Sequence, residues 1–119
     1  MSRDYRLYTD EIIESIHRIK EYTKDITFED FIKNKLILDA VLRNFEIIGE
    51  AIKNIPEELL KKYPSIDWKG IKGFRDIVAH RYFSLQLELI WDLIINKLDE
   101  LEEIAIQILG DLNKKTKAD

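Results

Sequence analysis

The sequence predicts an all-α protein, an up-and-down four-helix bundle with a short connecting helix. Apolar residues recur at three- and four-residue spacings along most of the 119 residues, which is the period of an amphipathic helix. Four glycines and two prolines leave little material for a turn-rich sheet. A hydrophobic content of 45% supplies one core, and 119 residues suit a single domain.

The first two helices follow from this spacing. One helix is expected over about residues 5 to 23. A second is expected from Thr27, its predicted N-cap, to about residue 54, because Asp30 stands where a variant capping box needs an acid. The apolar positions of the two helices are Ile12, Ile13, Ile16, Ile19 and Tyr22, then Leu36, Leu38, Val41, Leu42, Phe45, Ile48, Ala51 and Ile52.

The second half of the chain predicts a connector and two further helices. Pro56 followed by "EELLKK" indicates a short helix with Pro56 at its first position, which stops at Pro64. Ser65 is the expected N-cap of a third helix through "IDWKGIKGFRDIVAHRY". Ser84 is the expected N-cap of a fourth helix, which Gly110 would end. Residues 1–110 are therefore predicted as the helical domain and residues 111–119 as a polar tail.

Composition excludes several classes of function. Without cysteine there is no disulfide, thiolate zinc site or cysteine nucleophile, and two histidines cannot form an all-histidine metal site. We therefore expect neither a metal nor a cofactor. Neither Ser65 nor Ser84 stands in the context of a nucleophile. The charged start of the chain and the absence of a long apolar run predict a cytoplasmic protein with no membrane segment.

Charge is distributed unevenly. Residues 61–81 hold six basic and two acidic side chains, a net +4, so the remainder carries −8 of the total of −4. A basic segment on an acidic chain permits binding of a phosphate-bearing partner and disfavours a general duplex-DNA binder.

The stretch "GFRDIVAHRYF", residues 73–83, combines the side chains that could do chemistry. On a helical wheel at about 100° per residue, Phe74, Ile77 and Val78 share one arc with Ile71 and form the predicted core face. The other arc holds the polar residues and two lysines. Its members are Lys69, Lys72, Arg75, Asp76, His80 and Tyr82.

These polar residues suit chemistry on a phosphate. The planar fork of Arg75 matches a phosphate, and Asp76 at i,i+4 could orient His80. A histidine that titrates near neutrality exchanges protons with a ribose hydroxyl or a leaving oxygen. Arginine for charge and histidine for protons are the minimum set for RNA cleavage without a metal. Taken alone, the same residues also fit a salt-bridged surface, and His17 reads as a boundary histidine without a chemical role.

The motif "RDIVAHRY" resembles the R-x4-H-x-Y motif of HEPN-domain proteins of the HepT type, the toxins of two-gene bacterial and archaeal systems. The resemblance covers nearly the whole chain and includes "IIGEA" in the second helix and the pair Ile90 and Trp91 in the last. It implies a HEPN-like homodimer and a metal-independent endoribonuclease that leaves a cyclic phosphate. In that enzyme Arg75 would hold the scissile phosphate, His80 would be general base or acid, and Asp76 would support them.

The resemblance also implies a partner, an MNT-type nucleotidyltransferase antitoxin that adds AMP to Tyr82 and so blocks the cleft with negative charge. Lys69 and Lys72 are candidate RNA contacts. Phe74 stands where many relatives carry Met, and Glu50 of "IIGEA" could orient the arginine, help the dimer or lie on a plain surface. The alternative to a nuclease is a non-catalytic helical dimer that binds the nucleotidyltransferase through the same basic cleft.

Overall fold

The computed structural model describes residues 4–73 and 84–118, and the side chains of residues 72, 84–86 and 116–118 lie outside this description. The described residues form helices and loops with no strand among them, which confirms the all-α prediction. The elements are α1 (Arg6–Tyr22), α2 (Phe28–Lys33), α3 (Lys35–Lys53), α4 (Glu57–Leu60), α5 (Trp68–Lys72), α7 (Ser84–Asp92), the π-helix η1 (Leu93–Lys97) and α8 (Leu98–Ala118).

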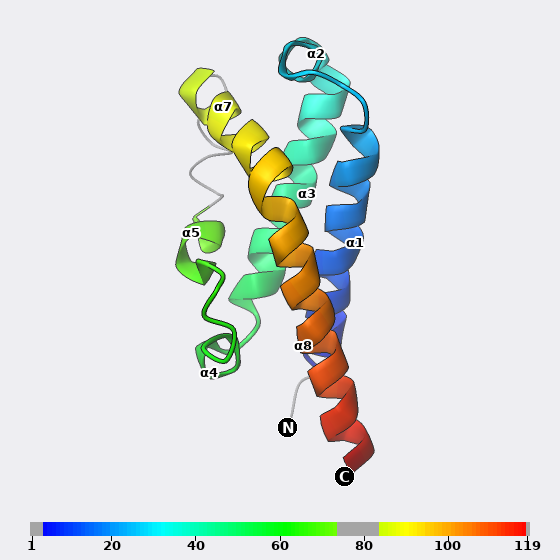
Figure 1. Cartoon of the computed structure of the whole chain (residues 1–119), viewed down its shortest axis with the longest axis vertical. Coiled ribbons are helices and arrows are strands. Elements are labelled where there is room, and N and C mark those ends of the chain that lie inside the picture. Colours follow the sequence, from blue (N-terminus) through cyan, green and yellow to red (C-terminus); the bar gives the residue numbers. More distant parts are fainter. Residues whose placement is uncertain (1–3, 74–83, 119) are drawn as a thin grey trace.

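Three long helices, α1, α3 and α8, run side by side and carry the core (Figure 1). Helix α1 packs against both of the others and buries Ile12, Ile16 and Ile19 almost completely, as its spacing predicts. Helices α7 and α8 form one long stretch that crosses the bundle obliquely (Figure 1). Helices α5 and α4 lie on one side of this stretch (Figure 1). The start of α1 and the end of α8 lie at the same end of the molecule (Figure 1).

The predicted second helix is interrupted, which corrects the single helix expected from Thr27 to residue 54. The capping box is present: Asp30 N donates to Thr27 Oγ1 at 3.1 Å and Thr27 N donates to Asp30 Oδ2 at 3.2 Å. At Asn34 the backbone is extended, with φ −95° and ψ 96°, and the side chain accepts a hydrogen bond from Ile37 N at 3.1 Å. Asn34 thus ends α2 and caps α3.

The connector contains the predicted short helix, α4, with Pro56 at its N-cap rather than at its first helical position. The next helix begins later than predicted, because Asp67 rather than Ser65 is the N-cap of α5. Of the predicted third helix the structure describes α5 only, and the remainder falls in residues 74–83.

The last helical stretch contains two departures from the prediction. A π-helical segment, η1, joins α7 to α8, and α8 continues past Gly110 to Ala118 instead of stopping there. A glycine costs about 1 kcal/mol in a helix, which is less than the surrounding helix-forming residues supply. The division of the chain at residue 110 stays a prediction.

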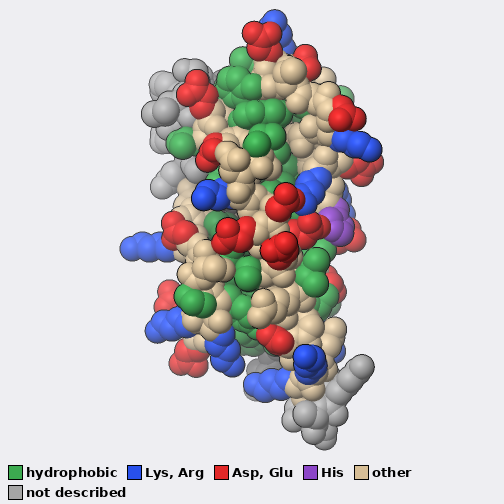
Figure 2. All heavy atoms as spheres, viewed as in Figure 1, with side chains coloured by type: hydrophobic (Ala, Val, Ile, Leu, Met, Phe, Trp, Pro, Cys, Tyr) green, Lys and Arg blue, Asp and Glu red, His purple; other side chains and the backbone are tan. Residues whose placement is uncertain are grey.

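The tip of the bundle is closed by aromatic contacts between α2 and α7. The ring of Trp91 lies 5.2 Å from that of Phe31 and 6.0 Å from that of Phe28, measured between centroids. Trp91 therefore packs α7 against α2. Figure 2 shows acidic and basic side chains interspersed over the visible face, with hydrophobic side chains exposed among them. No helix in the described part of the chain has the length and apolar character needed to cross a membrane.

Candidate functional site

Four predicted site residues, Arg75, Asp76, His80 and Tyr82, fall in residues 74–83, outside the described residues. Lys69 is described and its side chain is exposed on α5, whereas for Lys72 only the place at the end of α5 is known. The described part of the site is therefore made of the helices that lead into and out of this segment, α5 and α7, and of what holds them.

Helix α5 is fixed at both its start and its side. Asp67 Oδ1 accepts a hydrogen bond from Gly70 N at 3.0 Å, and Trp68 Nε1 donates to Tyr63 O at 3.0 Å. A Cβ at Gly49 of α3 would lie 3.8 Å from the carbonyl oxygen of Ile71, so the two helices approach backbone to backbone. This short helix therefore has a defined place against α3, and it ends three residues before Arg75, the first residue of the motif.

Tyr63 links the connector to the C-terminal helix. Its side chain is 7% exposed, and its hydroxyl donates to Asp111 Oδ2 at 2.6 Å. Burial, followed by this hydrogen bond to a carboxylate, raises the pKa of Tyr63 to about 12. The neutral hydroxyl is therefore held as a donor across the whole neutral pH range, and the approach to α5 is anchored on α8.

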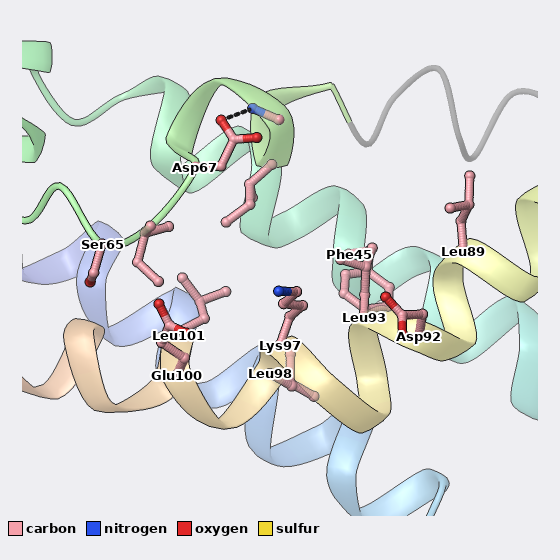
Figure 3. Close-up of a pocket in the computed structure, with 13 residues that line it drawn as sticks. Phe45, Ser65, Asp67, Leu89, Asp92, Leu93, Lys97, Leu98, Glu100 and Leu101 are labelled. Carbon is pink, nitrogen blue, oxygen red and sulfur yellow. Dashed lines mark hydrogen bonds between the residues drawn. The ribbon is translucent and has the colours of Figure 1, made fainter.

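A cavity of about 410 Å³ lies between α5 on one side and α7, η1 and α8 on the other (Figure 3). Its walls are mainly apolar. They include Phe45 of α3, Ile66 and Ile71 near α5, and Leu89, Leu93, Leu98 and Leu101 of the last helical stretch. Residues 74–83 are called the motif segment below. Two of the wall residues, Ile71 and Leu89, stand close in sequence to its two ends. The cavity is of the size that takes a small molecule.

Polar groups line the same cavity. Lys97, an exposed side chain, points its ammonium nitrogen toward the space between the walls (Figure 3), and it makes no ion pair with another described residue. Asp67, Asp92 and Glu100 contribute carboxylates, and Asp92 Oδ1 already accepts a hydrogen bond from Asn96 Nδ2 at 2.6 Å. Apolar walls with one cation and several acceptors can hold a flat, partly polar ligand.

His17 belongs to a second charged cluster, between α1 and α8. Its Nε2 lies 2.6 Å from Glu102 Oε2, and Lys20 Nζ reaches Glu102 Oε1 at 2.6 Å and also contacts Asp99. Lys20 lowers the pKa of Glu102 against the opposing effect of partial burial. The cluster pairs two long helices, which agrees with a structural role for His17. Among the described residues no group of three or more His, Asp or Glu side chains is placed to hold a metal ion.

Sequence reasoning missed the cavity and Lys97, and the spacing of apolar residues carries a signal only for the π-turn beside them. Ile90, Ile94 and Leu98 are all buried at four-residue spacing. Each four-residue step rotates by about 40° on a regular α-helix, so three such positions drift off one face. A wider π-turn between them restores the alignment. Asp67 was missed as the N-cap of α5 because Ser65, two residues earlier, is also a favourable N-cap residue.

Comparison with known proteins assigns the chain to a family. The family described as "Ribonuclease HepT-like" matches residues 12–108. The chain is 42% identical over 113 residues to "Putative RNase MJ0127" of Methanocaldococcus jannaschii, covering 92% of this chain and 93% of that protein. It is 39% identical over 104 residues to "Putative RNase TTE0752" of Caldanaerobacter subterraneus subsp. tengcongensis, covering 87% and 93%.

A third relative carries the family name itself. The chain is 37% identical over 102 residues to "Probable ribonuclease HepT" of Thermococcus cleftensis, covering 86% of this chain and 93% of that protein. No solved structure gives a significant match.

Proposed function

Because the chain belongs to the HepT-like ribonuclease family, we propose that it is a metal-independent endoribonuclease with Arg75 and His80 as its catalytic residues. The observation that carries this proposal is the family match over residues 12–108, which spans a motif whose residue types suit RNA cleavage. The basic character of residues 61–81, net +4, supports an RNA substrate.

In the proposed reaction the substrate supplies its own nucleophile. The ribose 2′-oxygen attacks the adjacent phosphorus, the bond from phosphorus to the 5′-oxygen breaks, and a 2′,3′-cyclic phosphate and a 5′-hydroxyl result. His80 takes the proton from the 2′-hydroxyl or gives one to the leaving 5′-oxygen. Arg75 binds the non-bridging oxygens, on which negative charge accumulates in the transition state. Asp76, four residues earlier in the sequence, supports His80.

The test compares RNA cleavage by the wild type, Arg75→Ala and His80→Ala in the presence of EDTA. The chain offers matched controls: His17→Ala removes its other histidine, and Arg18→Ala removes an exposed arginine paired with Glu14. Both controls should cleave at the wild-type rate, while each motif variant should lose a hundredfold or more, roughly the contribution of a general acid or base. Equal cleavage by all five proteins would reject the assignment.

The proposal includes a toxin role with a nucleotidyltransferase antitoxin as partner, a homodimeric state and a cytoplasmic location. Tyr82 is the proposed site of AMP addition, because a phosphate there would add negative charge seven residues from Arg75, on the same arc of the predicted helical wheel. Intact-protein mass spectrometry after co-expression with the neighbouring nucleotidyltransferase should show an added AMP on the wild type and none on Tyr82→Phe. The same added mass on both proteins would contradict Tyr82 as the site.

Light scattering on the purified chain tests the homodimer. Should the wild type leave RNA uncut and yet bind the nucleotidyltransferase in a manner that depends on Arg75 or Tyr82, the non-catalytic helical dimer is the correct function.

A further inference from the structure

The cavity between α5 and the last helical stretch lies within reach of the proposed catalytic arginine. Ile71 lines the cavity and precedes Arg75 by four residues. Four Cα-to-Cα steps span at most about 15 Å in any conformation of the chain. A molecule in the cavity is therefore close enough to belong to the same RNA strand as a phosphate bound by Arg75.

The lining of the cavity matches the parts of a nucleotide. Its walls are mainly apolar, with Phe45 only 2% exposed and Leu89 46% exposed. A planar base can pack between such surfaces, and a single-stranded base is free of stacking partners that would compete. Asp67 and Asp92 each make one hydrogen bond and keep further acceptor capacity. Such acceptors favour bases with an exocyclic amino group.

Lys97 supplies the positive charge. It is the one basic side chain among the described residues that line the cavity, and its ammonium points inward (Figure 3). An ammonium with no ion pair to a described neighbour is available to a phosphate. The exposed Lys69 on α5 adds a positive charge next in sequence to Gly70, which lines the cavity.

The π-turn η1 aligns this wall of the cavity. Leu89, Leu93, Lys97 and Leu101 follow each other at four-residue spacing, and all four line the cavity. On an uninterrupted α-helix they would spread over about 120°. The segment Leu93–Lys97 has the wider π geometry, which reduces this drift. Single π-turns inside α-helices are rare and are frequent at functional sites.

We propose that the cavity is a binding subsite for the base of a nucleotide that flanks the cleaved bond, with Lys97 contacting that nucleotide's phosphate. This inference rests on the proposed ribonuclease function and adds to it a preference: adenine, cytosine and guanine, which carry amino groups, bind better than uracil, which has none.

The direct test measures binding of AMP, CMP, GMP and UMP to the full-length chain by calorimetry or NMR titration. Lys97→Ala should weaken binding of the three amino-bearing nucleotides by roughly tenfold, and Lys97→Arg should retain it. Leu89→Trp should block binding by filling the opening. The matched control is Lys24→Ala, an exposed lysine in the loop between α1 and α2 that does not line the cavity, and it should bind as the wild type does.

With single-stranded RNA oligonucleotides, Lys97→Ala should also reduce the slope of log affinity against log salt by about 0.7, the loss of one phosphate contact. Circular dichroism of every variant checks that the helical fold is kept. Equal nucleotide affinities for the wild type, Lys97→Ala and Leu89→Trp would overturn the proposal, as would UMP binding as tightly as the other three nucleotides.

Mononucleotide binding needs no cleavage, so the subsite and the nuclease fail separately. Lys97-dependent nucleotide binding by a chain that does not cut RNA would uphold the subsite and reject the nuclease. Wild-type cleavage rates and base preferences in both Lys97→Ala and Leu89→Trp would reject the subsite and leave the nuclease intact.

Discussion

Replacing Tyr63 by Phe removes one hydroxyl at the joint between the connector and α8. That hydroxyl donates to Asp111 Oδ2 at 2.6 Å from a side chain that is 7% exposed. Hydrogen bonds to charged groups contribute about 1.5–3 kcal/mol. Asp111 is exposed, so its freed carboxylate regains water, and the lower end of this range applies. We expect Tyr63→Phe to lower the free energy of unfolding by roughly 1.5 kcal/mol at pH 8.

The difference depends on pH in a direction that the structure fixes. The pKa of Tyr63 rises from 10.0 to about 12 in the folded chain. Because the folded pKa is the higher one, this stabilisation is complete below pH 10 and is lost as the pH rises towards 12. The full gap corresponds to about 2.7 kcal/mol, of which roughly 1.4 kcal/mol is lost by pH 11. The wild type should therefore be about as stable as Tyr63→Phe at pH 11.

Urea unfolding followed by circular dichroism at pH 8, 10 and 11 measures these free energies. Lysines titrate in the same range, but they do so in both proteins and cancel in the difference. Tyr22→Phe is the matched control, since Tyr22 is 37% exposed, whereas Tyr63 is only 7% exposed. A gap between wild type and Tyr63→Phe that stays constant from pH 8 to 11 would refute the role of Asp111 in holding the proton.

Three further changes test the helices. Gly110→Ala should raise the unfolding free energy by about 0.5–1 kcal/mol, measured as a higher Tm, because α8 continues through this position and an added Cβ meets no atom within 4 Å. Thr27→Ala should cost about 1 kcal/mol in urea unfolding by removing the acceptor for Asp30 N, and Thr27→Ser should cost far less. Glu102→Gln should destabilise the chain at neutral pH but not in acid. The hydrogen bond from Lys20 lowers the pKa of Glu102 from its ordinary value of 4.5. The stabilisation from this carboxylate is therefore present above pH 4.5 and is lost as the pH falls through the lowered pKa. Unfolding curves of the wild type and Glu102→Gln, recorded from neutral pH into acid, measure the difference.

Local signals in the sequence predicted the helices well wherever one local interaction decided the outcome. The capping box at Thr27 is such a case, because both of its hydrogen bonds join residues three apart. Asn34 shows where this reasoning fails. Apolar spacing continues across it and favours one helix, but its side chain caps Ile37 N instead. Asparagine competes with the helix backbone in this way, and packing of α2 on Trp91 selects the broken form.

Part of the candidate site could also be predicted from the sequence, and part could not. A resemblance over nearly the whole chain, including "RDIVAHRY" and "IIGEA", predicted the family that the match over residues 12–108 shows, whereas the chemistry of the motif stays a prediction. The cavity beside it could not be predicted, since Lys97 and Ile71 come from elements more than twenty residues apart and meet only through the packing of α5 against α3. No spacing rule connects such positions. The buried row of Ile90, Ile94 and Leu98 indicates a wider turn, but not what the turn serves.

Both ends of the motif segment are held by the same long helical stretch, although by different contacts. The entry helix α5 is tied through Trp68 Nε1 to the carbonyl of Tyr63, whose hydroxyl binds Asp111 of α8. The exit helix α7 is continuous with α8 through η1, and Trp91 seats it on Phe31. The proposed catalytic residues, Arg75 and His80, must act at a fixed separation from a phosphate. The described helices on either side of their segment, α5 and α7, are both held by the stretch from α7 to α8, which fixes where that segment begins and ends. The π-turn lies within that helix, so the element that shapes the proposed base subsite is also the one that sets the direction in which the motif segment ends.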